Sequence, residues 1–102
     1  RDFLYIDDLI NLILKIIINK KSNGQIFNVG TGNPIKVKKL IQNIQKISKG
    51  GKPNYGAIKM RKDEIMYMYP SIRKSKKILK WKPKHSIEKG LKKTINYYRE
   101  NI

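Results

Sequence analysis

The sequence contains no cysteine and a single histidine, His85. Without thiols the chain can form neither disulfides nor thiolate metal sites, and one imidazole cannot build a cluster of histidine ligands. Acidic residues are also scarce, because 7 Asp and Glu stand against 24 Lys and Arg, and the formal net charge is +17. The composition therefore argues against a metal centre, and it raises the question of which partner suits the positive charge.

The sequence also lacks a long apolar run. The best candidate, Leu9 to Ile18, is interrupted by Asn11 and Lys15 and falls short of the roughly 20 residues that span a bilayer. We expect the start of the parent chain to be missing, so a signal peptide cannot be seen, and the cytoplasm is the default. We therefore expect a cytoplasmic protein without a membrane partner.

The chain opens in a pattern that normally lies inside a fold. Residues 3–6 are apolar or aromatic and read as a short strand, and Asp7 then offers a side-chain cap for an apolar helix. At 102 residues the chain is one small domain or part of one. We expect residues 1–102 to be the carboxyl-terminal part of a longer protein.

The positive charge favours ordinary solvated surfaces over a nucleic-acid site. Of the 24 basic residues 20 are Lys, scattered along the chain, and Ile is also abundant at 18, which indicates a general compositional bias. The alternative is a small basic helix-turn-helix module built from Ile72–Lys80 and Ile87–Arg99. A reading helix should carry Asn, Gln or Arg at its entry, and the second of these segments begins with Ile-Glu-Lys-Gly instead.

Apolar residues at helical spacing predict four helices. They run from Asp7 or Asp8 to Asn19, from about Lys36 to Ser48, from a cap at Ser71 to Leu79 or Lys80, and from a cap at Ser86 to about Glu100. Short extended pieces are expected at 3–6, 25–29, 55–58 and 65–69. The expected fold class is therefore mixed α/β, with about four helices and short strands. The first helix is apolar on most of its circumference, so it should be buried between other elements.

Two local patterns resemble cofactor or catalytic motifs but have simpler explanations. Gly30-x-Gly32 lacks the third glycine of a dinucleotide fingerprint, so it predicts a tight turn. Tyr55-x-x-x-Lys59 has the spacing of a dehydrogenase Tyr-Lys pair, but Gly56 opposes the helix that would bring the two side chains together. Trp81 is expected in the core, and His85 in a loop.

The block Arg61-Lys62-Asp63-Glu64 mixes charges of both signs. It is either a solvated turn or a binding loop, in which Arg61 supplies a phosphate fork and a carboxylate accepts from a sugar hydroxyl. Arg1 and Arg61 are two of only four Arg in a chain with 20 Lys. Because the chain otherwise prefers Lys, Arg at these positions indicates planar, bidentate contact with a phosphate.

Four stretches in order carry a family resemblance. They are RDFLYIDD at 1–8, QIFNVGTG at 25–32, SIRKSKKILKWKP at 71–83 and SIEKGLKKTINYYRE at 86–100. Together they resemble the carboxyl-terminal part of the NAD-dependent epimerase/dehydratase family, the extended short-chain dehydrogenases that act on nucleotide sugars. The stretch at 56–66 looks most like members that act on 4-keto-6-deoxy sugars. The ligand that this resemblance implies is a nucleotide-diphosphate sugar.

The resemblance also implies site residues. Arg1 matches the arginine that reaches the pyrophosphate in the family, and Arg61 matches a second arginine on the nucleotide moiety. Glu64 matches the acidic residue that holds a ribose hydroxyl, and Asp63 competes for this role because the usual Pro-Gly after Arg61 is replaced. Phe3 stands where some epimerases have a tyrosine that contacts the nucleotide.

In the family, the glycine fingerprint for NAD(P) and the catalytic Tyr and Lys belong to an amino-terminal Rossmann domain, upstream of Arg1. Residues 1–102 are therefore expected to be the substrate-binding domain, which by itself binds no NAD(P) and catalyses nothing. The parent enzyme of such a chain can be a homodimer. If the helix at Leu9–Ile18 packs on the Rossmann domain, the isolated chain exposes an apolar patch.

Overall fold

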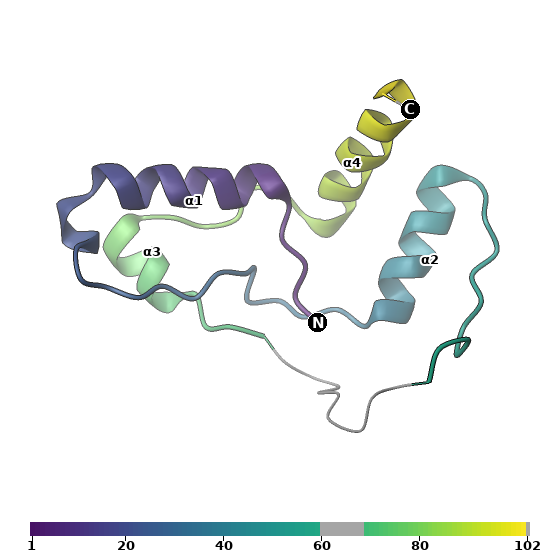
Figure 1. Cartoon of the computed structure of the whole chain (residues 1–102), viewed down its shortest axis with the longest axis horizontal. Coiled ribbons are helices and arrows are strands. Elements are labelled where there is room, and N and C mark those ends of the chain that lie inside the picture. Colours follow the sequence, from purple (N-terminus) through teal and green to yellow (C-terminus); the bar gives the residue numbers. More distant parts are fainter. Residues whose placement is uncertain (60–68, 102) are drawn as a thin grey trace.

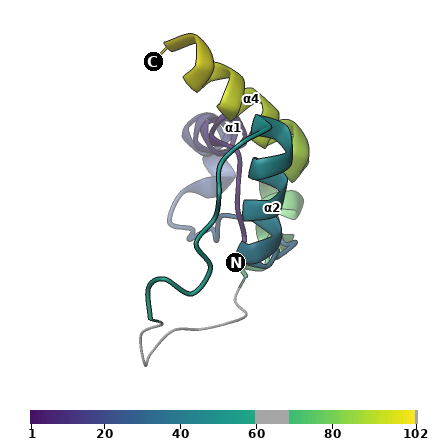
Figure 2. The same cartoon turned by 90° about the vertical axis from the view of Figure 1, so that its right-hand side faces the viewer.

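The computed structural model describes residues 1–59 and 69–101, and the regular secondary structure there is helical. The elements are α1 (Ile6–Ile18), the short 3₁₀ helix η1 (Lys20–Ser22), α2 (Val37–Ser48), α3 (Arg73–Leu79) and α4 (Ile87–Asn101). One group consists of α1, η1 and α3, and a second consists of α2 and α4 (Figure 1). The chain is thin, with extents of 48 × 38 × 19 Å, and Figure 2 shows its narrow side.

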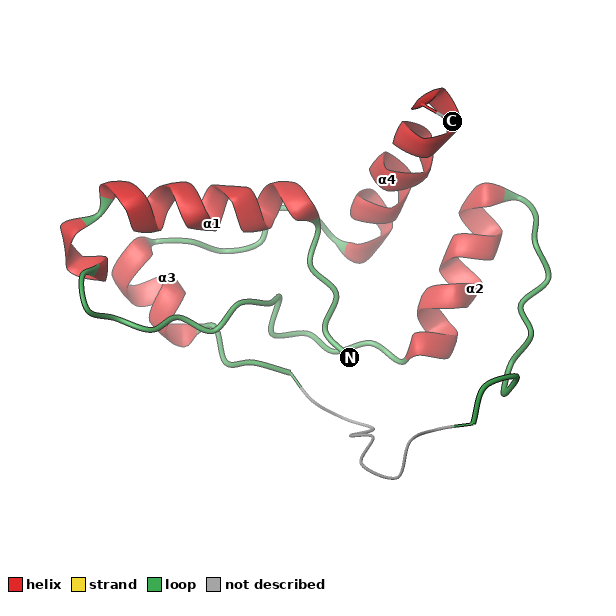
Figure 3. Ribbon diagram, viewed as in Figure 1, coloured by secondary structure: helices red, strands yellow, loops and turns green. Residues whose placement is uncertain are grey.

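The mixed α/β fold class predicted from the sequence is wrong for the described residues, which contain no strand (Figure 3). Residues 1–5 are extended, and Arg1 exchanges two main-chain hydrogen bonds with Ile35, at 2.9 and 2.7 Å. A strand needs a ladder of such pairs along a neighbour. The described residues supply only this one rung for the segment, so alternation of apolar side chains alone does not make a sheet.

The other predicted extended pieces also form no strand where the structure describes them. Residues 25–29 carry no regular structure, and at 55–58 the chain turns, with the Ala57 N–H donating to the Asn54 carbonyl at 3.3 Å. The predicted piece at 65–69 lies outside the described residues, apart from Tyr69.

The four predicted helices are confirmed, but two of their predicted caps are wrong. The cap residue of α1 is Tyr5, which makes no side-chain capping bond, and Asp7 lies inside the first turn, where its charge suits the helix dipole. The cap residue of α3 is Ile72 and not Ser71. Ser86 caps α4 as predicted, since its Oγ accepts from a main-chain N–H of the first turn at 3.2 Å.

A small core forms where α1, α3 and the segment after α3 meet. Leu12, Ile72, Leu79 and Trp81 are each at most 7% exposed. Trp81 lies in the core as predicted, and its indole N–H donates to the main-chain carbonyl of Asp8 at 3.1 Å. This contact ties the segment after α3 to the first turns of α1.

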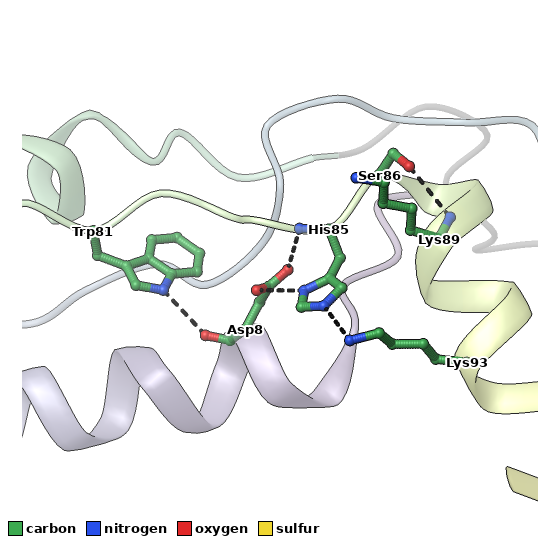
Figure 4. A network of polar contacts seen from close by, with 6 residues as sticks. All are labelled: Asp8, Trp81, His85, Ser86, Lys89 and Lys93. Atoms are coloured by element: carbon green, nitrogen blue, oxygen red, sulfur yellow. Dashed lines mark hydrogen bonds and ion pairs between the residues drawn. The ribbon is translucent and has the colours of Figure 1, made fainter.

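Asp8 is the buried polar centre of the fold (Figure 4), because its side chain sits in α1 and is only about 1% exposed. Its carboxylate accepts from the His85 main-chain N–H at 3.0 Å and lies 3.0 Å from the His85 Nδ1. The other ring nitrogen of His85 lies 3.1 Å from the Lys93 Nζ. An ammonium group only donates, so Nε2 accepts and Nδ1 carries the proton that is donated to Asp8.

Hydrogen bonds hold the Asp8 carboxylate in its charged form. Burial raises the pKa of Asp8, but hydrogen bonds from the His85 ring and from the main-chain N–H groups of His85 and Lys84 outweigh it. The pKa of Asp8 therefore lies below its ordinary value of 3.8. The hydrogen bonds between the Asp8 carboxylate and residues 84–85 therefore hold the loop before α4 against α1.

The sequence predicted that the first helix is buried between other elements, and for the described residues this prediction is wrong. One face carries Leu12 into the core, but another face is apolar and open to solvent in the described structure, with six side chains that are each at least 45% exposed. These are Ile6, Ile10, Ile13, Leu14, Ile17 and Ile18. They recur at helical spacing and none of them is charged, so they form a continuous apolar stripe, here named the outer face of α1.

The two faces of α1 should respond differently to truncation. We expect Leu12→Ala to lower the free energy of unfolding by about 2–5 kcal/mol, because it opens a cavity in the core. The neighbouring Ile13→Ala should change it by no more than about 0.5 kcal/mol, since Ile13 lies on the outer face. Urea unfolding followed by circular dichroism measures both, and equal losses would contradict this assignment of the faces.

Replacing the buried carboxylate should destabilise the fold and change its response to acid. We expect Asp8→Asn to lower the free energy of unfolding by about 1–3 kcal/mol, because the amide leaves donors of the 84–85 segment unsatisfied. The exposed neighbour in Asp7→Asn loses the same charge and serves as the matched control.

The pH dependence follows from the lowered pKa of Asp8. A depressed carboxyl pKa contributes stability that is complete above the ordinary value of 3.8 and is lost as the pH falls through the folded-state pKa. We expect the wild-type chain to lose stability below about pH 4 more steeply than Asp8→Asn does. Parallel acid unfolding curves for the two proteins would show that Asp8 does not cause the loss of stability at low pH.

Candidate functional site

The described part of the site starts with the extended segment at residues 1–5. Arg1 is exposed, and its main chain is held on both sides, since its nitrogen donates to the Ile35 carbonyl at 2.9 Å and its carbonyl accepts from the Ile35 N–H at 2.7 Å. Figure 1 shows this end of the chain between the two helical groups, beside the segment that leads into α2. The arginine therefore stands on a main chain with a defined place.

The next residue is held even more tightly. The Asp2 carboxylate accepts from the Thr31 N–H at 2.9 Å, from the Gly32 N–H at 2.8 Å and from the Thr31 hydroxyl at 2.5 Å. Gly30 is buried beneath this contact, and a Cβ there would lie 2.7 Å from the Asp2 Oδ2 and 2.5 Å from the Pro70 Cγ. Where the sequence predicted a tight turn, the chain bends at Gly30 and at Gly32, and this segment receives the Asp2 carboxylate.

A basic cavity of about 580 Å³ opens beside this segment. Phe3 and Ile35 contribute apolar surface, and Lys76, Lys82 and Lys84 contribute positive charge. None of the described residues that line the cavity is acidic. The resulting positive potential favours an anionic ligand over a cationic one.

The structure describes only part of the predicted site. Arg1 is placed as given above, whereas Arg61, Asp63 and Glu64 lie outside the described residues, so their approach to Arg1 stays a prediction. Phe3 lines the cavity and is partly buried.

Sequence reasoning missed two pairs that act as units, Asp2 with Thr31 and Asp8 with His85. Their members lie 29 and 77 residues apart. Periodicity does not report such distances. The one available signal for the first pair was a carboxylate next to the candidate Arg1.

The described residues offer no evident acid-base or metal centre. Asp8 and His85 form a carboxylate–imidazole pair, but Asp8 is buried and both His85 ring nitrogens have partners. Within the described ranges no three His, Asp or Glu side chains gather as metal ligands, and none of the helices there has the length and apolarity to cross a membrane.

The sequence matches a family of nucleotide-sugar enzymes along nearly its whole length. The family profile described as GDP-mannose 4,6 dehydratase matches residues 1–94. A UDP-glucuronate 4-epimerase from Thermodesulfobacterium geofontis is 38% identical over 104 residues, which is 100% of this chain and 31% of that protein. A CDP-abequose synthase from Salmonella muenchen is 40% identical over 98 residues, which is 94% of this chain and 33% of that protein.

A solved structure agrees with these sequence relatives. The crystal structure of a UDP-glucose 4-epimerase with UDP-glucose, from Thermotoga maritima, superposes on 99% of this chain with a TM-score of 0.87 and 31% identity, and the match covers 32% of that chain. This chain therefore spans about a third of the length of the relatives that it matches. Since the family profile covers residues 1–94 and the fold agrees, the chain belongs to the NAD-dependent epimerase/dehydratase family and corresponds to the carboxyl-terminal part of its members.

Proposed function

We propose that this chain is the part of an NAD(P)-dependent nucleotide-sugar epimerase, dehydratase or 4-keto-6-deoxysugar reductase that holds the nucleotide diphosphate. The observation that carries the proposal is Arg1, an exposed arginine on a main chain fixed by Ile35, in a chain that otherwise prefers Lys. The named relatives carry UDP- or CDP-linked sugars in their names. The chemistry that these compounds share is a diphosphate between a nucleoside and a sugar.

The proposed contacts follow from side-chain chemistry. Arg1 and Arg61 each present a planar fork of N–H donors, which fits two oxygens of a phosphate. Glu64, or Asp63 in its place, offers two acceptor oxygens to the ribose diol. The lysines of the neighbouring cavity add positive potential that attracts the diphosphate but supply no fixed geometry.

The remaining roles belong to a part of the enzyme that would lie outside residues 1–102. In this proposal an amino-terminal Rossmann domain holds NAD(P), which supplies hydride transfer, and carries the catalytic Tyr and Lys. The outer face of α1 would pack against that domain. This chain would then contribute substrate orientation, which is the entropic part of catalysis.

The helix-turn-helix alternative has less support from the fold. A helix-turn-helix packs two successive helices across a short turn, whereas α3 packs on α1 and η1 and α4 packs on α2. The buried Trp81 also lies in the segment between α3 and α4. A DNA duplex therefore serves as the control ligand in the binding experiment below.

The proposal is tested by titrating the chain with UDP, CDP, GDP and dTDP in a calorimeter, with a random DNA duplex as control, at low and moderate salt. We expect one diphosphate to be preferred, and Arg1→Ala and Arg61→Ala each to weaken its binding by roughly 10- to 100-fold, the worth of a charge-assisted contact. Arg73→Ala removes the same charge from the exposed surface of α3 and should leave binding nearly unchanged.

The contrary result is also well defined. DNA binding that persists at moderate salt, together with no preference among the four diphosphates, would favour the basic binding module, because non-specific phosphate contacts weaken steeply as salt rises. If Arg1→Ala and Arg73→Ala weaken diphosphate binding equally, binding depends on the net charge of the chain and not on the position of Arg1.

A further inference from the structure

We infer that Asp2 and Thr31 are positioning residues for Arg1, which means that their contact decides how well Arg1 is presented to the diphosphate. This inference rests on the proposed function, because it concerns the same binding site. It assigns a role to Asp2, whose carboxylate is engaged by Thr31 and Gly32 and has no proposed contact with the ligand.

The contact between Asp2 and Thr31 is dense in donors. The Thr31 hydroxyl accepts from the Asn33 N–H at 3.0 Å, and it lies 2.5 Å from the Asp2 Oδ1 but 3.2 Å from the Asn33 carbonyl, so its proton is directed at the nearer carboxylate. The Thr31 and Gly32 N–H groups donate to the same carboxylate at 2.8 to 3.0 Å. A single acceptor group thus satisfies three donors of the turn, each bond strengthened by the negative charge.

The Asp2–Thr31 contact and the main-chain bonds to Ile35 hold two consecutive residues, Asp2 and Arg1. Arg1 is fixed through its own nitrogen and carbonyl, and Asp2 is fixed through its side chain, with both partners in the 31–35 segment. The main chain of Arg1 is therefore already ordered before the ligand binds. Ordering a group before the ligand arrives reduces the entropic cost of binding, which is the physical basis of pre-organisation.

Two glycines, Gly30 and Gly32, allow the main chain to approach the Asp2 carboxylate closely. Gly30 leaves no room for a side chain between Pro70 and the Asp2 carboxylate, with 2.5 and 2.7 Å to an added Cβ. Gly32 has a φ of +78°, a conformation that glycine adopts without strain. Both glycines thus serve to bring main-chain N–H groups up to Asp2.

The substitution Asp2→Asn distinguishes a positioning role of Asp2 from a purely electrostatic one. Asp2→Asn removes a negative charge next to the proposed diphosphate site, so a purely electrostatic account predicts tighter binding of the anion. Positioning predicts the opposite sign, because an amide cannot accept from three donors and also presents donors of its own to the turn. The direction of the change therefore decides between the two.

The experiment is the calorimetric titration of the chain with the diphosphate that it prefers among UDP, CDP, GDP and dTDP. We expect Asp2→Asn to weaken binding roughly tenfold, and Thr31→Val, which keeps the shape and the N–H but loses the hydroxyl, to weaken it by roughly threefold. Asp7→Asn removes the same charge at an exposed position of α1 and should leave binding unchanged or slightly tighter.

A second measurement needs no ligand. Hydrogen exchange at the Ile35 amide, which donates to the Arg1 carbonyl, should be faster in Asp2→Asn and in Thr31→Val than in the wild type, while the amides in the middle of α4 keep their protection. Protection of the α4 amides shows that each variant is folded. If Asp2→Asn fails to fold, Thr31→Val supplies the decisive comparison.

The outcomes distinguish the inference from the proposed function. If Arg1→Ala weakens binding while Asp2→Asn and Thr31→Val bind as well as the wild type or better, the positioning role is wrong and the proposed function stands. If Arg1→Ala has no effect, or none of the four diphosphates binds, both are overturned. Unchanged exchange at Ile35 in both variants would also overturn the positioning role.

Discussion

The described fold depends on one buried carboxylate and on the donors that satisfy it. Asp8 lies in the first turns of α1, and its charge would cost several kcal/mol in this environment without hydrogen bonds. The donors come from His85, 77 residues further along the chain, and from the main chain of Lys84, while Trp81 donates to the Asp8 main chain. The segment between α3 and α4 must therefore run along α1. Because residues 1–5 lead directly into α1, the same contact also helps to place the segment that carries Arg1.

The two faces of α1 connect the fold to the proposed function. A helix that is apolar on most of its circumference belongs between other elements, and the described residues cover only the Leu12 face. A second copy of this chain would bring another +17 of charge to the outer face, and this repulsion opposes self-association. A partner with less positive charge suits the outer face better than a second copy does.

Charge and geometry have separate roles in the proposed binding site. Twenty Lys give the chain a positive potential that attracts any anion, and the basic cavity beside Phe3 concentrates it. Discrimination needs donors in fixed positions, and Arg1, which we propose for this role, stands on a main chain held by Ile35 and Asp2. The diphosphate is the chemical group that the names of the relatives share, so an arginine fork on a fixed main chain is the part of the proposed site expected to serve any member.

The sequence by itself determined the features that depend on near neighbours. Helical spacing identified α1, α2, α3 and α4, and the order of four motifs identified the family, because both signals are written in consecutive residues. Only the tertiary structure decided that residues 3–6 and 25–29 form no strand, that the outer face of α1 is open in the described structure, and that Asp2 and Asp8 have partners 29 and 77 residues away. The physical reason is that ladders, burial and satisfied carboxylates are properties of segments distant in sequence, and periodicity within one segment carries no information about them.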